Sequence, residues 1–260
     1  VIAPGDVDQC YYKTIEAFYL AEKYQLPVVV LTDKYLGESY ISTEPFKNDG
    51  IVIDRGLVLT EQDLEKMEEY KRYKVTESGV SPRALPGTKG GEHVASSYEH
   101  DEEGFEREEE EVRIAMHDKR FRKMEQASRE IKNPAVIGNG YSDITVVSWG
   151  STKGPILDAM RLLEADGIYA NFLQIVYMSP FPTEQVEEVL SLARRSIIIE
   201  NNKTSQLGGL IKEQTGLEIE HKLLKYDGRP FSPEQIYEAI RKIVVESTTV
   251  IESLEKIVRK

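Results

Sequence analysis

Short apolar runs alternate with amphipathic segments of helical period between residues 144 and 209. The apolar runs consist of strand-favouring residues, and Gly150 and Gly167 stand where a strand and a helix would stop. The predicted elements are a strand at 144–151, a helix at 155–167, a strand within 168–182, a helix at 183–195 and a strand at 196–200. Repeated strand–helix–strand units predict an α/β fold with a doubly wound, parallel-rich sheet.

The residues that follow complete the same domain. NNKTSQLGG (201–209) leads into a helix, and its paired glycines suit either an anion at the helix N-terminus or close packing of the helix on the sheet. Neither P-loop spacing nor G-x-G-x-x-G is present, which argues against a phosphate loop. A last strand near Leu223 precedes a helix from Pro233 to about Glu246, with Ser232 as its N-cap. The tail, residues 246–260, is predicted to extend as an amphipathic helix.

The first residues have the character of the end of another domain. VIAPGD is typical of a strand end running into a helix that Asp6 caps, and we expect further residues upstream of Val1. VVVLTD (28–33) is a β-branched run, as in a strand buried on both faces of a parallel sheet. Asp33 and Lys34 would then lie at the carboxyl edge, where open α/β sheets bind ligands. A capping role for Asp33 explains its position equally well.

The segment from residue 42 to 129 is irregular and highly charged. A short strand and a charged helix beginning near Thr60 are expected first. Residues 79–104 form a Pro/Gly-rich loop, and loops of this length are usually functional or disordered. Within it, Arg83 either grips a carboxylate or phosphate with its planar guanidinium or pins the loop to an acidic surface.

A long charged helix is predicted at residues 106–129. Its apolar stripe is narrow, which suits a helix that crosses a surface or packs against a partner chain. The stripe consists of Val112, Ile114, Ala115, Met116, Phe121 and Met124.

The YEHDEE run places His100, Asp101 and Glu102 side by side. Imidazole and carboxylates bind several metal ions, but no second histidine stands at helical metal-ligand spacing, so we predict no metal site. We expect these three residues to face basic groups or helix N-termini of another subunit. No residue of the chain is assigned a catalytic role.

Composition narrows the class of protein. With 40% hydrophobic and 30% charged residues, the 260-residue chain suits a folded globular protein rather than a disordered one. The net charge of −12 makes nucleic acid an unlikely partner. The single cysteine, Cys10, excludes an intrachain disulfide or an all-cysteine cluster, and we interpret it as a packed helix residue. No run of about eighteen apolar residues and no signal peptide are present, so we expect no membrane association and a cytoplasmic location.

Several segments together resemble one enzyme family. VIAPGD, LTDKYLGESY, SPRALPGT, SYEHDEEG, VSWGS, PFP, IIIENN and QLGG occur in the order found in the alpha subunit of archaeal and bacterial 2-oxoacid:ferredoxin oxidoreductases. The block from Asp143 onward also resembles the C-terminal domain of transketolase and of pyruvate dehydrogenase beta subunits. The first resemblance runs over nearly the whole chain.

The resemblance implies a thiamine diphosphate enzyme that decarboxylates a 2-oxoacid, passes electrons through iron–sulfur clusters to ferredoxin and transfers the acyl group to coenzyme A. It implies that the segment holding Ser81 and Arg83 lies near substrate or coenzyme, at a subunit junction. The partner is a beta subunit that holds the diphosphate and Mg2+, together with possible further subunits.

The departures from the family pattern limit what this chain does alone. The tyrosine-proline-isoleucine-threonine-proline signature, the glutamate that activates the aminopyrimidine and the cluster cysteines are absent. We therefore expect this chain alone to bind no cofactor and to be inactive.

The expected domains are the end of a pyrimidine-type domain (1–55), a connecting arm (56–141), a transketolase C-like domain (142–245) and the helical tail (246–260). The alternative function is a non-catalytic, transketolase C-like subunit-interface module. The sequence encoded upstream discriminates between the two, because the enzyme requires the missing signature there. The 2-oxoacid is not identified by any motif.

Overall fold

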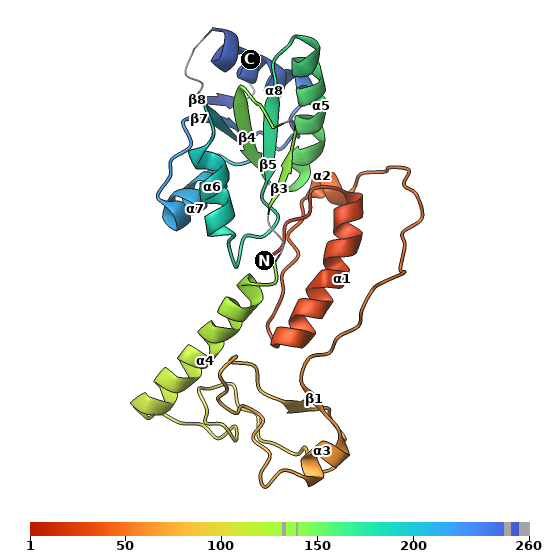
Figure 1. The fold of residues 1–260 in the computed structure, drawn as a ribbon, viewed down its shortest axis with the longest axis vertical. Helices are drawn as coiled ribbons and strands as arrows, with labels where there is room; N and C mark the ends of the chain where they lie inside the picture. The colour runs from red at the N-terminus through yellow and green to blue at the C-terminus, as the bar shows by residue number, and fades with distance from the viewer. Residues whose placement is uncertain (132–133, 139, 247–250, 255–260) are drawn as a thin grey trace. The chain divides into compact units, whose positions relative to one another are not determined.

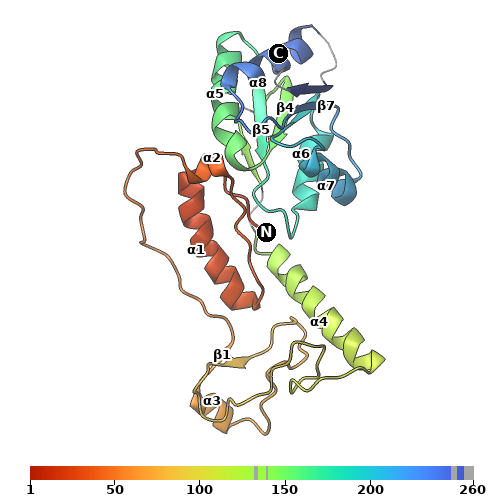
Figure 2. The ribbon, with the colours of Figure 1, turned by 180° about the vertical axis from the view of Figure 1, so that it is seen from behind.

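The computed structural model describes residues 1–131, 134–138, 140–246 and 251–254. These residues form two compact units (Figures 1 and 2). The sheet unit comprises residues 1–14, 29–47 and 132–260, and the arm unit comprises residues 15–28 and 48–131. The domain limits drawn from the sequence stay a prediction.

A six-stranded sheet in the order β3-β5-β4-β6-β7-β8 is the centre of the sheet unit. Its strands are β3 (Ala135–Ile137), β4 (Ile144–Ser148), β5 (Ala170–Gln174), β6 (Ser196–Glu200), β7 (His221–Lys225) and β8 (Ile251–Leu254). β3 pairs antiparallel with β5, and every other neighbouring pair is parallel. The predicted parallel-rich sheet is therefore confirmed.

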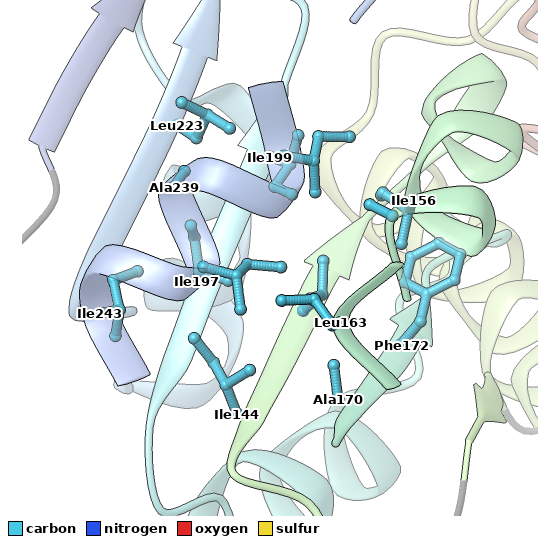
Figure 3. Close-up of a cluster of buried hydrophobic side chains, with 14 of the residues drawn as sticks. Ile144, Ile156, Leu163, Ala170, Phe172, Ile197, Ile199, Leu223, Ala239 and Ile243 are labelled. Atoms are coloured by element: carbon cyan, nitrogen blue, oxygen red, sulfur yellow. The ribbon is translucent and has the colours of Figure 1, made fainter. Parts of the chain in front are cut away.

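Helices cover both faces of this sheet, which makes it doubly wound. They are the 3-10 turn η1 (Gly150–Thr152), α5 (Lys153–Ala165), α6 (Thr183–Ser191), α7 (Gln206–Thr215) and α8 (Pro233–Val245). Because strand side chains alternate between faces, Ile197 and Ile199 pack with α5 and α8, whereas Ile198 packs with α6 and α7. Figure 3 shows the first of these clusters, in which Phe172 and Leu163 are fully buried.

The helical tail predicted at 246–260 is wrong for the residues described there. Ile251–Leu254 form β8, parallel to β7 with Lys222 opposite Ile251. The physical reason is the free edge of β7: α8 serves as a crossover, and a parallel strand beside β7 satisfies its backbone hydrogen bonds. Residues 247–250 and 255–260 lie outside the described residues.

The strand predicted at 28–33 is also wrong. Val30 forms one isolated parallel bridge to Ile2, and Val29 is 53% exposed. A β-branched run favours extended backbone, but only a neighbouring strand turns it into a buried ladder, and here Ile2 alone pairs with it. By contrast, the predicted first helix is confirmed as α1 (Val7–Tyr24), because the Asp6 carboxylate accepts a hydrogen bond of 2.7 Å from the Gln9 N–H.

The arm unit has little regular structure, as its sequence predicts. β1 (Val58–Leu59) pairs in parallel with β2 (Arg83–Ala84), and α3 (Glu61–Glu65) begins at a capping box that joins Thr60 to Asp63. α3 is much shorter than the charged helix expected from Thr60.

α4 (Glu110–Ser128) confirms the long charged helix but not its predicted face. Ile114 and Phe121, expected in the apolar stripe, are 61% and 68% exposed. The buried positions are Met116, Lys119, Lys123 and Ala127. The stripe was misassigned because two lysines lie on the buried face.

Among the helices of the described residues, none combines the length and the apolar character of a membrane span.

Candidate functional site

The order of the strands places a crevice at one edge of the sheet. From β4 the chain crosses to β5 on one side, and β6 then lies on the other side of β4. This reversal is a topological switch point, and the carboxyl ends of the flanking strands are where such sheets bind ligands. A cavity of about 240 Å³ lies there, lined by Pro4, Leu31, Thr32, Asp33, Trp149, Gly150, Ser151, Thr152, Asn201, Asn202 and Gln206.

The Glu200 carboxylate organises the β6 side of this crevice. Glu200 is fully buried at the end of β6, beside the N-terminus of α7. Its carboxylate accepts five hydrogen bonds, from Trp149 Nε1 (3.2 Å), Asn202 Nδ2 (2.7 Å), Ser205 Oγ (3.0 Å), the Leu207 N–H (2.9 Å) and the Gly208 N–H (3.2 Å). A carboxylate at a helix N-terminus is also favoured by the helix dipole.

The two alternatives for the paired glycines are thereby separated. The α7 amides at Leu207 and Gly208 bind a carboxylate of the protein itself, so they are not free for a phosphate. A Cβ atom at Gly208 would lie 2.4 Å from Ser205 Oγ. Close packing at the start of α7 therefore accounts for this glycine.

Asp33 and Lys34, predicted from the edge rule, do lie at the carboxyl edge of the sheet. One Asp33 oxygen accepts a hydrogen bond of 2.9 Å from the Leu36 N–H and caps α2 (Lys34–Gly37), and the other accepts from the Ser151 hydroxyl. Both residues line a second cavity of about 290 Å³. The capping role proposed for Asp33 is confirmed, and a ligand role stays a prediction.

The side chains at the carboxyl edge of the sheet offer hydrogen bonds to a ligand. The Ser151 hydroxyl donates directly to Asp33, with no imidazole between them. His221, at the start of β7, is buried, and burial lowers its pKa because it disfavours the charged form. A hydroxyl needs an adjacent base to become a nucleophile. Cys10 offers no alternative, since burial and the charges of nearby acids raise the pKa of its thiol. The cavity suits a polar ligand rather than a covalent step.

Ser81 and Arg83 belong to the arm unit. Ser81 is fully buried; its hydroxyl donates to the Lys74 carbonyl (2.9 Å), and its own carbonyl accepts from Gln25 Nε2 (2.6 Å). The Arg83 guanidinium is paired with Glu22, which also binds Arg55. Arg55 first, and then Arg83, lower the pKa of Glu22. Arg83 Nε is buried with no hydrogen-bond partner among the described atoms.

His100, Asp101 and Glu102 form the hydrogen bonds of their own loop. The Asp101 carboxylate accepts from the Glu103, Gly104 and Phe105 N–H groups, each at 3.0 Å. Despite partial burial, which acts in the opposite direction, the Phe105 N–H and the Arg107 guanidinium lower the pKa of Asp101. The Glu102 carboxylate accepts a hydrogen bond of 2.7 Å from the Val75 N–H. The His100 ring lies against the Tyr73 ring, with the two centroids 4.0 Å apart. Their predicted interface role stays a prediction.

Three residues of interest escaped the sequence analysis: Glu200, Lys119 and Lys123. For Glu200 the signal was an acid at a strand end followed by glycines at a helix start. For the lysines it was their spacing of four on a helix whose neighbours Met116 and Ala127 share the same face.

Known proteins match both parts of the chain. Residues 1–119 match the family model of the thiamine diphosphate-binding domain of pyruvate flavodoxin/ferredoxin oxidoreductase, and residues 142–236 match core domain II of pyruvate:ferredoxin oxidoreductase. The chain is thus built from two successive domains of this class of oxidoreductase. It belongs to the 2-oxoacid:ferredoxin oxidoreductase family, as part of an alpha subunit.

Individual relatives agree with that assignment. The alpha subunit of 2-oxoacid:ferredoxin oxidoreductase from Saccharolobus solfataricus is 37% identical, over 94% of this chain and 39% of its own length. Subunit alpha of 2-oxoacid:ferredoxin oxidoreductase 2 from Aeropyrum pernix is 35% identical, over 94% and 38%. The structure of 2-oxoglutarate:ferredoxin oxidoreductase from Magnetococcus marinus superposes with a TM-score of 0.85 at 31% identity, over 94% of this chain and 42% of that one. The chain therefore spans about two fifths of these relatives.

Proposed function

We propose that this chain works within a thiamine diphosphate-dependent enzyme that oxidatively decarboxylates a 2-oxoacid to acyl-coenzyme A and passes the electrons to ferredoxin. The observation that carries the proposal is the 37% identity to a 2-oxoacid:ferredoxin oxidoreductase alpha subunit over 94% of the chain. The Magnetococcus marinus relative, whose structure contains 2-oxoglutarate, coenzyme A and succinyl-CoA, supports these small molecules as the substrate class. The proposed partners are a beta subunit and ferredoxin, and the proposed location is the cytoplasm.

The cofactors of the proposed enzyme are held largely outside this chain. Within the described residues, no group of three His, Cys, Asp or Glu side chains is placed to hold a metal ion. One cysteine cannot ligate an iron–sulfur cluster that takes four. The cysteine count therefore does not fit a four-cysteine cluster, and we propose that the cluster and Mg2+ are held by other parts of the complex. Thiamine diphosphate, where bound, acts as the electron sink for decarboxylation.

The chain's own residues would orient and enclose the reactants. We propose that Arg83 lies near the 2-oxoacid or coenzyme A, because a guanidinium with a spare donor suits an anionic group. Ser81 fixes the loop that carries Arg83, since its hydroxyl and carbonyl are both engaged within the arm unit. Asp33 and Lys34 are proposed as ligand-proximal, and His100, Asp101 and Glu102 as part of an interface with another subunit.

The function is tested by assembling the enzyme. The complete alpha subunit is co-expressed with its beta subunit, and reduction of ferredoxin is followed with pyruvate, 2-oxobutyrate or 2-oxoglutarate. We expect reduction that requires both a 2-oxoacid and coenzyme A. An assembled, cofactor-loaded complex that reduces ferredoxin with none of the three acids would contradict the proposal.

The chain alone should bind thiamine diphosphate no better than millimolar. Because the family signature and activating glutamate are absent from this sequence, the cofactor would meet an incomplete pocket. Calorimetric titration of the 260-residue chain with thiamine diphosphate and Mg2+ measures the dissociation constant, and the assembled enzyme serves as the positive control. A micromolar constant for the chain alone would show that the pocket is complete without a partner.

A further inference from the structure

Two lysines of α4 are buried in the arm unit. Lys119 and Lys123 are only 5% and 8% exposed, although lysine is almost never fully buried without a partner of opposite charge. They are four residues apart, so they lie on the same face of the helix, one turn from each other. Like charges at this spacing repel, and burial strengthens the repulsion.

Further positive charge surrounds them. Arg72 and Arg120 both lower the pKa of Lys119 and Lys123 by their charge. Arg72 Nη1 is held at 3.0 Å by Gln25 Oε1, and its guanidinium lies 5.1 Å from the centroid of the Tyr73 ring. Gln25 joins two of these cations, because its side-chain oxygen binds Arg72 and its carbonyl binds Lys123.

The nearby acids are engaged elsewhere. Glu99 binds Arg120 through both carboxylate oxygens, at 2.9 and 2.6 Å. Glu102 accepts from the Val75 N–H at 2.7 Å and lies 3.7 Å from Lys71 Nζ. Neither carboxylate hydrogen-bonds to Lys119 or Lys123. Glu102 raises the pKa of Lys119 by its charge, but within the described residues neither lysine has an ion pair with a carboxylate.

The hydrogen-bonding capacity of the lysines is also largely unused. An ammonium has three donors, yet Lys119 has no hydrogen-bond partner among the described residues, and Lys123 Nζ makes one long bond of 3.3 Å to the Gln25 carbonyl. Burial, followed by the charge of Lys123, lowers the pKa of Lys119 to about 8. Burial, followed by the charge of Arg72, lowers the pKa of Lys123 to about 8.

We propose that Lys119, Lys123 and Arg72 form a binding site for a phosphate-type oxyanion. Neighbouring cations with unused N–H groups match a dianion, whose several oxygens accept more than one hydrogen bond. The ammonium of Lys119 is not fully enclosed, because among the described side chains the fully enclosed nitrogens without a hydrogen-bond partner are Arg83 Nε and Arg122 Nε. The small exposed area of the lysines excludes an extended polyanion.

The source of the phosphate chemistry is either free phosphate or the phosphate of a nucleotide. Calorimetric titrations of the full chain with inorganic phosphate and with ADP separate these sources. A lower dissociation constant for ADP than for inorganic phosphate assigns the site to a nucleotide. Equal dissociation constants assign it to the free ion. Binding of neither at millimolar concentration would overturn the proposal.

The variant Lys119→Met tests the residues. Because it removes one of two buried like charges, we expect it to raise the melting temperature of the anion-free chain and to weaken phosphate binding at least tenfold. Arg113→Met is the matched control, since it removes one positive charge from an exposed position of the same helix. A lower melting temperature for Lys119→Met, with unchanged phosphate binding, would show a purely structural lysine.

The pH dependence of binding gives a second readout. Sulfate is the probe, because it stays a dianion throughout the range. Its affinity should fall as pH rises through about 8, where Lys119 and Lys123 lose their protons; the other charged groups that act on Lys119 are Arg72, Arg120 and Glu102. Affinity that is unchanged between pH 7 and 9.5 would contradict the role of the lysines.

Discussion

Replacing Glu200 with alanine should destabilise the chain by about 3–5 kcal/mol, because removing one side of a buried charged network leaves its partners unsatisfied. The donors that would lose their acceptor include two side chains, those of Trp149 and Asn202, and two backbone N–H groups of α7.

Two further variants complete the comparison: Glu200→Gln separates the charge of Glu200 from its volume, and Glu213→Ala is the surface control. Glu200→Gln keeps the volume but loses the charge and presents an N–H to groups that also donate, so we expect an intermediate loss. Glu213→Ala, at an exposed position of α7, should change stability by less than about 0.5 kcal/mol.

Denaturant unfolding followed by fluorescence measures these losses. Trp149 is the single tryptophan, and its indole N–H donates to Glu200, so its emission reports on this site. Equal stability of Glu200→Ala and Glu213→Ala would show that the Glu200 network contributes nothing.

The sheet was predictable because its information is local. Ile144–Ser148, Ser196–Glu200 and the helices between them each carry a clear period, and the handedness of parallel crossovers leaves few ways to connect them. The strand predicted at 28–33 and the helix predicted in the tail were wrong for the same reason. Whether an apolar run joins a sheet depends on which edge remains free, and β7 offers such an edge whereas the run at Val30 meets only Ile2.

The site was predictable only in part. The edge rule correctly placed Asp33 and Lys34 at the carboxyl edge of the sheet, although the strand on which that reasoning rested does not form, and their ligand role stays a prediction. Glu200 was missed because it meets the Leu207 and Gly208 N–H groups only after residues 201–205 turn back, with Ser205 in the left-handed region at φ 53°. Lys119 and Lys123 were missed because a lysine in a highly charged helix is expected on the solvated face.

Arg83→Ala is expected to raise the apparent KM of the assembled enzyme for the 2-oxoacid or coenzyme A by about 10- to 100-fold, which is the loss of one charge-assisted hydrogen bond. The subunits should still co-purify. The reasoning rests on the unused capacity of the side chain: a guanidinium has five donors, and among the described residues Glu22 takes one of them, through Nη2.

Arg55→Ala is the matched control, because Arg55 Nε binds the same Glu22 oxygen at 3.2 Å but its side chain is 50% exposed. Steady-state kinetics and co-purification are measured for both variants. If Arg83 serves only to hold Glu22, the two variants will behave alike with unchanged KM. Lost co-purification of Arg83→Ala alone would place Arg83 at an interface, and unchanged kinetics and assembly would leave it a surface-loop residue. The ligand role requires the remaining outcome, which is a raised KM in Arg83→Ala alone with unchanged assembly.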